Sequence, residues 1–380
     1  MSERRMIQIS RPSFGEEEYA ALKAPLDSGW VTQGPRVKQF ETDFAARHNV
    51  KHALAVSNCT TALHLALVAA GVGPGDEVIV PAFTWVATAN AVLYCNAKPV
   101  FADIELSTFN LDPGKLKDRI TSRTKAVIPV HLFGLCMDVE HLQEIAPGIA
   151  IIEDGACAAG ASLRNKPAGS LGDIGCFSFH PRKSITTGEG GMLTTNNGLL
   201  KEKMDQMRNH GASVSEEQRH HGPRPYILPG FSMVGYNYRM TDLQGALGVE
   251  QLKKLDAFIS ERNKWASFYE SELSVIPWLK TPSVAVDQKH GWQSYVLLID
   301  ENKSPMKRNE LMDHLLRAGI STRPGTHAVH MLEYYSETYG LKPSDLPESR
   351  KANDLSMAIP LHNKMTEEDY KHIVNVLKKV

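Results

Sequence analysis

Long apolar runs are missing from this 380-residue sequence. A helix that crosses a membrane needs about 20 consecutive apolar residues, so we expect no such helix and no membrane partner. Residues 1–18, MSERRMIQISRPSFGEEE, include basic residues but no apolar stretch behind them. Because a secretory signal requires that stretch, the sequence predicts a cytoplasmic protein.

Patterned cysteines and an excess of charge are missing as well. The five cysteines are scattered and odd in number, without the short spacing of a zinc or redox motif, so we predict no metal and a reducing compartment. Lys and Arg total 42 against 43 for Asp and Glu, which leaves no electrostatic footprint for nucleic acid. A small-molecule partner is therefore favoured.

What the sequence does contain is an alternation of short apolar runs with amphipathic stretches. This alternation predicts an α/β fold of three layers with a mostly parallel central sheet, whose ligand lies beyond the carboxyl ends of the strands. Strands are expected at 53–57, 77–81, 125–131, 149–154 and 175–179, and helices at 60–70, 88–95 and 139–146.

The rest of the chain predicts a second, smaller lobe. Residues 238–273 have helical periodicity over a length sufficient to link two lobes, and the polar stretch 210–230 before them is expected to form a long functional loop. We expect a large domain at 1–255, which includes the N-terminal segment, and a small C-terminal α/β domain at 256–380. The small domain should contain a strand at 294–300 and helices at 306–319 and 367–379.

The junction AVSNCTTALHLAL offers a first candidate site. A strand is expected to end at Ser57 and a helix to begin near Thr60, and the free N–H groups of a helix start can bind a phosphate. The alternative is an ordinary capped helix with Asn58 or Thr60 as the N-cap.

Two further candidates are an acid and a lysine. Asp154 closes an expected strand in IIEDGACAAG, where it could bind a metal, orient a base, pair with a cationic ring nitrogen, or only cap the next turn. Lys183 lies in GCFSFHPRKSITTGEGG, between an apolar run and a glycine-rich turn, unlike a solvated surface lysine. Arg182 beside it should depress the pKa of Lys183, which would favour condensation with a carbonyl group.

The chain resembles the DegT/DnrJ family of nucleotide-sugar aminotransferases, which have the fold type I architecture of aspartate aminotransferase. The resemblance covers nearly the whole length and implies the cofactor pyridoxal 5'-phosphate. It rests on these motifs, which follow one another in the family's order: SGWVTQGPRVKQFE, AVSNCTTALHLAL, GDEVIVPAFTWVATANAV, PVFADI, VHLFG, EDGACAAGA, GSLGDIGCFSFHPRKSITTGEGG and GYNYRMTDLQGALG.

The resemblance implies a catalytic pair. Lys183 corresponds to the lysine that binds the cofactor covalently and shuttles the proton of the amino donor. Asp154 corresponds to the acid that keeps the pyridine nitrogen protonated. Asn237 resembles the residue that reaches the cofactor phosphate of the neighbouring subunit, which implies a homodimer with shared active sites.

Other roles are implied by position in the same way. The phosphate grip corresponds to the N–H groups of Cys59 and Thr60 with the hydroxyl of Ser178. Trp85 stands where the family stacks an aromatic ring on the cofactor, although a core tryptophan is the alternative. Many members have Gly where Cys59 stands.

Cys157 is a second departure from the family. Many members have Gln or His here, which contacts the phenolic oxygen of the cofactor, whereas a thiol donates only weakly. A small buried residue is the alternative reading. His180 and His327 are candidate substrate contacts, as is Glu189, which could instead shape the glycine turn.

These observations predict an enzyme that moves an amino group from an amino acid, L-glutamate in our hypothesis, to a keto group of a nucleotide-linked deoxysugar. Three alternatives remain open at this point. A cofactor-dependent sugar dehydratase would have histidine in place of Lys183, and a non-catalytic cofactor- or sugar-binding regulator would have no use for Lys183 with Asp154. A flavodoxin-like nucleotide binder would be colourless.

Overall fold

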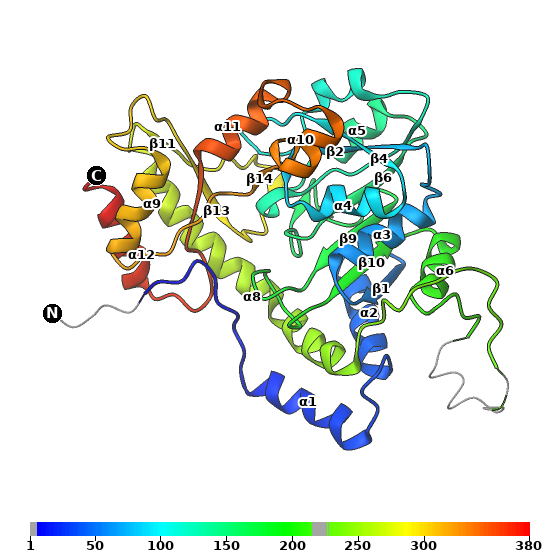
Figure 1. The fold of residues 1–380 in the computed structure, drawn as a ribbon. Helices are drawn as coiled ribbons and strands as arrows, with labels where there is room; N and C mark the ends of the chain where they lie inside the picture. The colour runs from blue at the N-terminus through cyan, green and yellow to red at the C-terminus, as the bar shows by residue number, and fades with distance from the viewer. Residues whose placement is uncertain (1–5, 215–225, 227) are drawn as a thin grey trace.

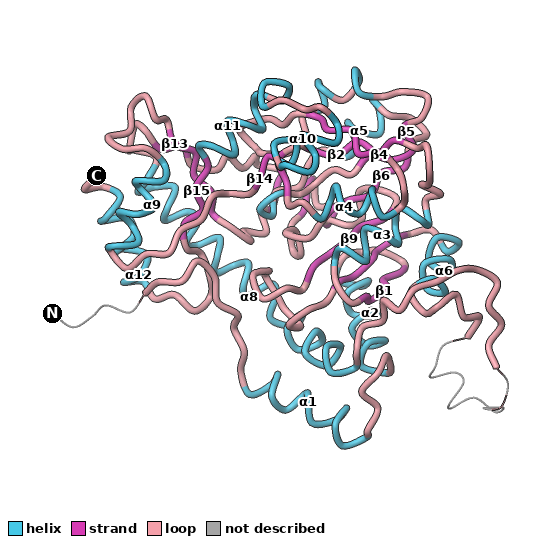
Figure 2. Tube along the Cα trace, in the orientation of Figure 1, coloured by secondary structure: helices cyan, strands magenta, loops and turns pink. Residues whose placement is uncertain are grey.

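The computed structural model describes residues 6–214, 226 and 228–380, and its fold is drawn in Figures 1 and 2. Much of the polar stretch expected to form a long loop, 215–225 with 227, lies outside the described residues. Within the described part of the chain, no helix is both long and apolar enough to span a bilayer. The predicted α/β architecture is confirmed.

A seven-stranded sheet forms the centre of the larger part. Six of its strands run in the same direction, and only β10 runs against its neighbours β1 and β9. The prediction of a mostly parallel sheet holds, but β10 was not among the expected strands. In spatial order the strands are β1 (His52–Val56), β10 (Gly191–Thr195), β9 (Ile174–Ser178), β6 (Ala150–Asp154), β5 (Thr124–Val127), β2 (Glu77–Pro81) and β4 (Lys98–Ala102).

Side chains of this sheet alternate between two apolar cores, one on each face. Ala53 and Ala55 of β1 belong to the core that also contains Phe40, whereas Leu54 and Val56 belong to the opposite core. This period of two explains why short runs of small and branched apolar residues were recognisable as buried strands.

Helices cover both faces and complete the three layers. Those on the first face are α2 (Pro35–Arg47), α5 (Val139–Ile145) and the first part of α8 (Asp242–Leu273), and those on the second face are α3 (Cys59–Ala69), α4 (Ala87–Tyr94) and α6 (Gly198–Met207). The predicted helices at 60–70, 88–95 and 139–146 are confirmed to within one residue at each end.

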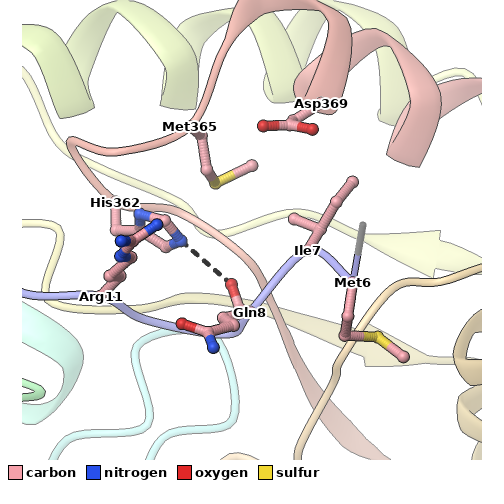
Figure 3. Close-up of a pocket in the computed structure, with 7 residues that line it drawn as sticks. All are labelled: Met6, Ile7, Gln8, Arg11, His362, Met365 and Asp369. Carbon is pink, nitrogen blue, oxygen red and sulfur yellow. Dashed lines mark hydrogen bonds between the residues drawn. The ribbon is translucent and has the colours of Figure 1, made fainter. Parts of the chain in front are cut away.

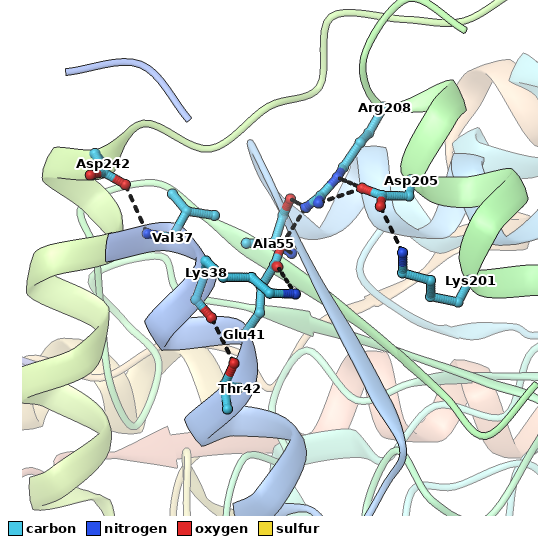
Figure 4. Close-up of polar contacts among 9 residues, drawn as sticks. All are labelled: Val37, Lys38, Glu41, Thr42, Ala55, Lys201, Asp205, Arg208 and Asp242. Carbon is cyan, nitrogen blue, oxygen red and sulfur yellow. Dashed lines mark hydrogen bonds and ion pairs between the residues drawn. The ribbon is translucent and has the colours of Figure 1, made fainter. Parts of the chain in front are cut away.

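A buried ion pair joins three of these elements. Arg208, just after α6, donates through Nη1 to Glu41 Oε1 of α2 at 2.5 Å and to the carbonyl oxygen of Ala55 in β1 at 2.6 Å. Its Nε donates to Asp205 Oδ1 at 2.9 Å. Figure 4 shows the guanidinium between the helices and the strand, where removal of Arg208 would leave Glu41 without its buried partner.

A smaller sheet with its own core lies at the other end of α8 (Figure 1). Its antiparallel strands, in the order β11, β13, β15, pack against the end of α8 and two further helices. These elements are β11 (Leu279–Lys280), β13 (Tyr295–Ile299), β15 (Ser356–Ile359), α9 (Arg308–Arg317) and α12 (Glu367–Leu377), which confirm the expected strand at 294–300 and the two expected helices.

The N-terminal segment from Met6 packs on this smaller core. Ile7 is buried in it, and His362 Nε2 lies 3.1 Å from the carbonyl oxygen of Gln8. A cavity of about 260 Å³ lies beside this contact (Figure 3). None of the predicted site residues lines the cavity.

Residues after α9 return to the larger part. The short strand β14 (His327–Ala328) pairs with β3 (Phe83–Thr84), and Val329, Tyr335 and Leu346 are buried in the core on the second face. The remaining elements are α1 (Glu16–Ser28), which packs on α8, α10 (Glu333–Tyr339), α11 (Pro347–Leu355), β7 (Ser162–Leu163), β8 (Lys166–Pro167) and β12 (Gln288–Lys289).

Candidate active site

The predicted site residues gather at one edge of the large sheet. Asp154 is the last residue of β6, and Ser178 is the last residue of the neighbouring β9. Gly191, the first residue of β10, pairs with both Ser178 and Val56 of β1. This is the carboxyl edge of the parallel strands, where α/β proteins bind their ligands.

The start of α3 lies at this edge. It has an N-cap, and two of its N–H groups remain free to bind an anion. Asn58 Oδ1 accepts from the N–H of Thr61 at 2.9 Å, which confirms Asn58 as the N-cap. Cys59 and Thr60 are the first two helical residues. Their N–H groups have no acceptor within the helix, because no helical turn precedes them. The cap and the anion site are therefore compatible, because different N–H groups serve them.

Gly191 is required by the close approach of β10 to this helix start. A Cβ atom at this position would lie 2.5 Å from the carbonyl carbon of Asn58 and 2.9 Å from the nitrogen of Cys59. Any side chain would push the helix start away. The glycine thus fixes the N–H groups of α3 relative to the end of β9.

Asp154 is held in a buried polar pocket. Its side chain is 5% exposed; Oδ2 accepts from Thr88 Oγ1 of α4 at 2.8 Å and Oδ1 accepts from the N–H of Ala156 at 3.1 Å. Thr84 Oγ1 lies 3.1 Å from Thr88 Oγ1. Burial raises the pKa of Asp154, although both hydrogen bonds and the charge of Lys183 act to lower it. A nearby cation would therefore stabilise the ionised carboxylate.

Lys183 lies close enough to Asp154 for the two charges to interact. Its Nζ donates to Cys157 Sγ at 3.2 Å, and Asp154 and Cys59 act on its charge. Burial lowers the pKa of Lys183, but Cys157, Cys59 and Asp154 outweigh burial and raise it. The expected depression by Arg182 was wrong, because groups distant in sequence lie closer to the amine.

Helix α8 anchors the loop that carries Lys183. Gln244 Nε2 donates to the carbonyl oxygen of Glu189 at 2.7 Å, Gln251 Oε1 accepts from the N–H of Thr186 at 3.2 Å, and Arg262 Nη1 donates to Ser184 Oγ at 3.3 Å. The three α8 residues are about two and three turns apart, so one face of the helix holds the loop.

Arg262 is a hub that the sequence analysis missed. It is 5% exposed and also donates to the carbonyl oxygen of Trp292 at 3.2 Å and to Asn363 Oδ1 at 2.9 Å. In the described part of the chain no carboxylate lies within 4 Å of it, and burial lowers its pKa to about 10. An arginine in a long amphipathic helix resembles a surface residue, so only the fold identifies it.

Thr88 was missed for a similar reason. A threonine within ATANAV looks like another small helix residue, and its contact with Asp154 joins positions 66 residues apart. The one available signal was its position on the buried face of the predicted helix.

The histidine and glutamate candidates near Lys183 differ in their surroundings. The His180 N–H donates to Ser178 Oγ at 3.4 Å, and burial lowers the pKa of the His180 imidazole. Glu189 is exposed, and its carbonyl oxygen accepts from Thr187 Oγ1 at 2.6 Å as well as from Gln244. The backbone of Glu189 thus supports the glycine turn, while its carboxylate faces solvent.

Trp85 and His327 lie together. Their ring centroids are 5.6 Å apart, because the pairing of β14 with β3 brings the two residues to one place. Trp85 is 57% exposed, so the reading of a core tryptophan was wrong. An exposed indole ring beside the sheet edge is available for stacking.

Asn237 is exposed on a segment paired with the residues after α6. Asn237 forms a bridge with Asn209, and Arg239 Nη1 donates to Asn209 Oδ1 at 2.7 Å. The carbonyl oxygen of Tyr238 accepts from the N–H of Ser57 at 2.9 Å, next to the start of α3.

His131, by contrast, is a core residue. It is fully buried; Nε2 donates to Glu153 Oε2 at 2.8 Å and Nδ1 accepts from the N–H of Met137 at 3.1 Å. Glu153 also accepts from three backbone N–H groups of residues 169–172. The described residues contain no group of His, Cys, Asp and Glu that could hold a metal ion.

The pocket suits a phosphorylated, cationic aromatic aldehyde, the class to which pyridoxal phosphate belongs. Lys183 offers an amine and Asp154 a buried carboxylate, while the N–H groups of Cys59 and Thr60 suit a phosphate and Trp85 an aromatic face. Each functional part of the cofactor thus has a matching group at this edge.

Comparison with known proteins identifies the family. The model of the DegT/DnrJ/EryC1/StrS aminotransferase family matches residues 12–378. The spore coat polysaccharide biosynthesis protein SpsC of Bacillus subtilis is 39% identical over 98% of this chain and 97% of its own. The GDP-perosamine synthase of Caulobacter vibrioides is 39% identical over the full length of both chains.

A solved structure agrees with the cofactor. The PLP form of Spr1654 from Streptococcus pneumoniae superposes with a TM-score of 0.89 at 27% identity and covers 98% of each chain. Together with the pocket at the sheet edge, these matches show that the chain belongs to the DegT/DnrJ/EryC1/StrS aminotransferase family, whose enzymes depend on pyridoxal phosphate.

Proposed function

We propose that this aminotransferase transfers the amino group of an amino acid, L-glutamate, to the keto group of a nucleotide-linked deoxysugar. The observation that carries the proposal is the full-length match to a family with sugar-modifying members, one of them a GDP-perosamine synthase. Lys183 contacts Cys157 and interacts electrostatically with buried Asp154, and this arrangement supports amino-group transfer.

The roles of the chain's own groups follow from their chemistry. Pyridoxal phosphate, when bound, supplies an electron sink for the electrons left at Cα when the donor loses its proton. Asp154 holds a proton at the pyridine nitrogen, and Thr88 orients that carboxylate. Lys183 Nζ takes the proton from the donor Cα and delivers it to the product side of the reaction.

The remaining groups bind and orient. When pyridoxal phosphate is bound, Cys59, Thr60 and Ser178 would hold its phosphate, and Trp85 would cover one face of its ring. Cys157 stands where many members of the family have the Gln or His that contacts the phenolic oxygen. We assign the substrate contacts to His180 and Glu189, which lie on the loop between β9 and β10, and to His327 of β14.

We also propose a homodimer in which Asn237 serves the neighbouring site, and a cytoplasmic location. The exposure of Asn237 in the single chain leaves it available to a partner, and five free cysteines fit a reducing compartment. The proposed division into domains at 255 has support in the separate cores at the two ends of α8.

The central experiment is a panel of keto-sugars linked to different nucleoside diphosphates, GDP among them, incubated with enzyme and L-glutamate. We expect 2-oxoglutarate and an aminated sugar of matching mass in equal amounts. A dehydrated sugar, formed without any aminated product, would contradict the proposal.

Borohydride reduction identifies the lysine that binds the cofactor, and it does so independently of the sugar substrate. Reduction should fix the cofactor on the peptide that contains Lys183. An adduct on another lysine would overturn the central assignment even if the sugar panel succeeded.

A further inference from the structure

The contact between Lys183 and Cys157 joins an amine to a thiol, and the reaction described above needs no thiol. The two atoms are 3.2 Å apart, and both residues are only partly buried. Cys157 lies in the turn after β6, whereas Lys183 follows β9, so the pair depends on the pairing of these two strands. A reagent that reaches the pocket can therefore reach both groups.

The other four cysteines are far less accessible. Cys59, Cys95, Cys136 and Cys176 are buried, and Cys157 alone has intermediate exposure. Burial raises the pKa of all four buried thiols, to about 11 for Cys95, which keeps them in the unreactive protonated form. An oxidant that enters the pocket should therefore act on Cys157.

The contact between a free Lys183 ammonium group and Cys157 exists in one state of the enzyme only. Peroxides oxidise the sulfur of a cysteine thiolate, and the amine lies within 3.2 Å of that sulfur while it is free. When the lysine nitrogen is bound to the cofactor, it no longer provides that free ammonium group.

We propose that Cys157 and Lys183 form an oxidant-sensitive modification site, in which hydrogen peroxide oxidises Cys157 and the product condenses with Lys183 into a sulfur–nitrogen cross-link. The site is open when Lys183 is free and closed when Lys183 holds the cofactor.

The chemistry balances in two steps. The thiolate attacks hydrogen peroxide, an S–O bond forms, the O–O bond breaks, and hydroxide leaves; sulfur is oxidised and peroxide oxygen is reduced. The Lys183 ammonium loses one proton, and the neutral amine then attacks the sulfenic sulfur; an S–N bond forms, the S–O bond breaks, and the leaving hydroxyl takes a second proton from nitrogen to depart as water. A low-molecular-weight thiol restores both residues by attack on sulfur, which releases the amine and leaves a disulfide that a second thiol reduces.

The cross-link would consume the amine that holds the cofactor. The oxidised chain could not bind pyridoxal phosphate covalently, and reduction would return this ability without new synthesis. Oxidation of the sulfur beyond the sulfenic state would be irreversible, so the nearby amine also protects the enzyme from permanent damage.

The test treats the full-length enzyme with hydrogen peroxide in two forms, one with Lys183 bound to the cofactor and one freed of cofactor by dialysis against hydroxylamine. In the freed form we expect a mass lower by two hydrogen atoms and a proteolytic cross-link between the peptides of Cys157 and Lys183. Dithiothreitol should reverse both. The cofactor-bound form should show neither.

Two variants and a matched control sharpen the result. Cys157→Ala should abolish the cross-link, whereas Cys95→Ser, which changes a buried cysteine, should leave it intact. In Lys183→Arg the cation remains but the amine is lost, so dimedone should trap sulfenic acid on Cys157 without any cross-link.

Three outcomes would overturn the proposal: a disulfide between Cys157 and Cys59, a backbone sulfenamide within the Cys157 peptide, or sulfinic acid as the first product. Only the protection by cofactor rests on the proposed role of Lys183. If the cross-link forms equally in both forms, that role fails while the modification site stands.

Discussion

Thr88 Oγ1 donates a hydrogen bond of 2.8 Å to Asp154 Oδ2, and this contact links α4 on one face of the sheet to the end of β6. The acid that we propose to hold the proton of the pyridine nitrogen is thus oriented by a residue from another layer. Its second oxygen is fixed by the N–H of Ala156, so both oxygens have defined directions.

Replacement of Thr88 by valine should misorient this carboxylate. The near-isosteric change removes one hydrogen bond to a buried group, and we expect the free energy of unfolding to fall by about 1–3 kcal/mol. The half-reaction with L-glutamate, followed by absorbance, should slow, while Thr88→Ser should retain both properties. Equal losses in the two variants would show that packing rather than the hydroxyl matters.

Asp154→Asn should have opposite effects on the cofactor-free protein and on catalysis. Because burial raises the folded-state pKa of Asp154, the folded chain binds more protons than the unfolded chain, and this contribution to stability is lost as pH rises. The variant without cofactor should therefore melt higher than wild type at pH 8, with a smaller difference below the ordinary pKa of aspartate. The half-reaction should slow by orders of magnitude. A pH-independent difference in melting temperature would contradict the shift.

Gly191→Ala should displace the start of α3. The new methyl group would collide with the backbone of Asn58 and Cys59, at a cost of about 1–3 kcal/mol in unfolding free energy. The affinity for pyridoxal phosphate, measured by fluorescence titration, should weaken more than that for pyridoxal. Gly73→Ala, whose Cβ would have no atom within 4 Å, is the matched control.

Arg262→Met should loosen the loop that carries Lys183. Loss of the bonds to Ser184 and to the Trp292 carbonyl should lower kcat by about 10- to 100-fold, since small misplacements of a reacting group carry penalties of this size. The pH midpoint of the absorbance of the bound cofactor should shift as well. Lys253→Met, an exposed change on the same helix, should leave both unchanged.

Mixed dimers test the shared site. Lys183→Ala and Asn237→Asp homodimers should both be inactive, the second because a carboxylate repels the phosphate. Refolding the two together should recover roughly a quarter of wild-type activity, since about half the dimers are mixed and each has one intact site. Absence of activity in mixed dimers seen by native mass spectrometry would show that Asn237 does not serve the neighbour.

Most of the sheet was predictable because its strands are short and their apolar side chains face two cores. The run 77–81 matched its strand at both ends, and 53–57 was displaced by one residue. Strand β10 escaped because GMLTT follows a glycine-rich turn and carries two threonines, whose burial depends on hydrogen bonds to Gly169 and Asp173. No local pattern reveals such partners.

The residues of the candidate site also fall into those that the sequence predicts and those that only the fold identifies. Asn58, at the start of α3, and Asp154, at the end of a strand, follow from chain-local rules, and the position of Lys183 came from the family's motif. The direction of the Lys183 pKa shift did not follow, because it depends on Cys157, Cys59 and Asp154, which only the folded chain brings near the amine. Thr88 and Arg262 required the fold for the same reason.

Helix α8, at 32 residues and about 48 Å, is part of two apolar cores, one in the larger part of the molecule and one in the smaller part. If one half of a continuous helix unfolds, the peptide groups at the break lose hydrogen-bond partners that the unfolded half provided. The larger and smaller parts of the molecule should therefore melt in a single cooperative step. The backbone amides in the two halves of α8 should exchange with solvent at similar rates. The helix that holds the lysine loop should thus also make the larger and smaller parts of the protein one thermodynamic unit.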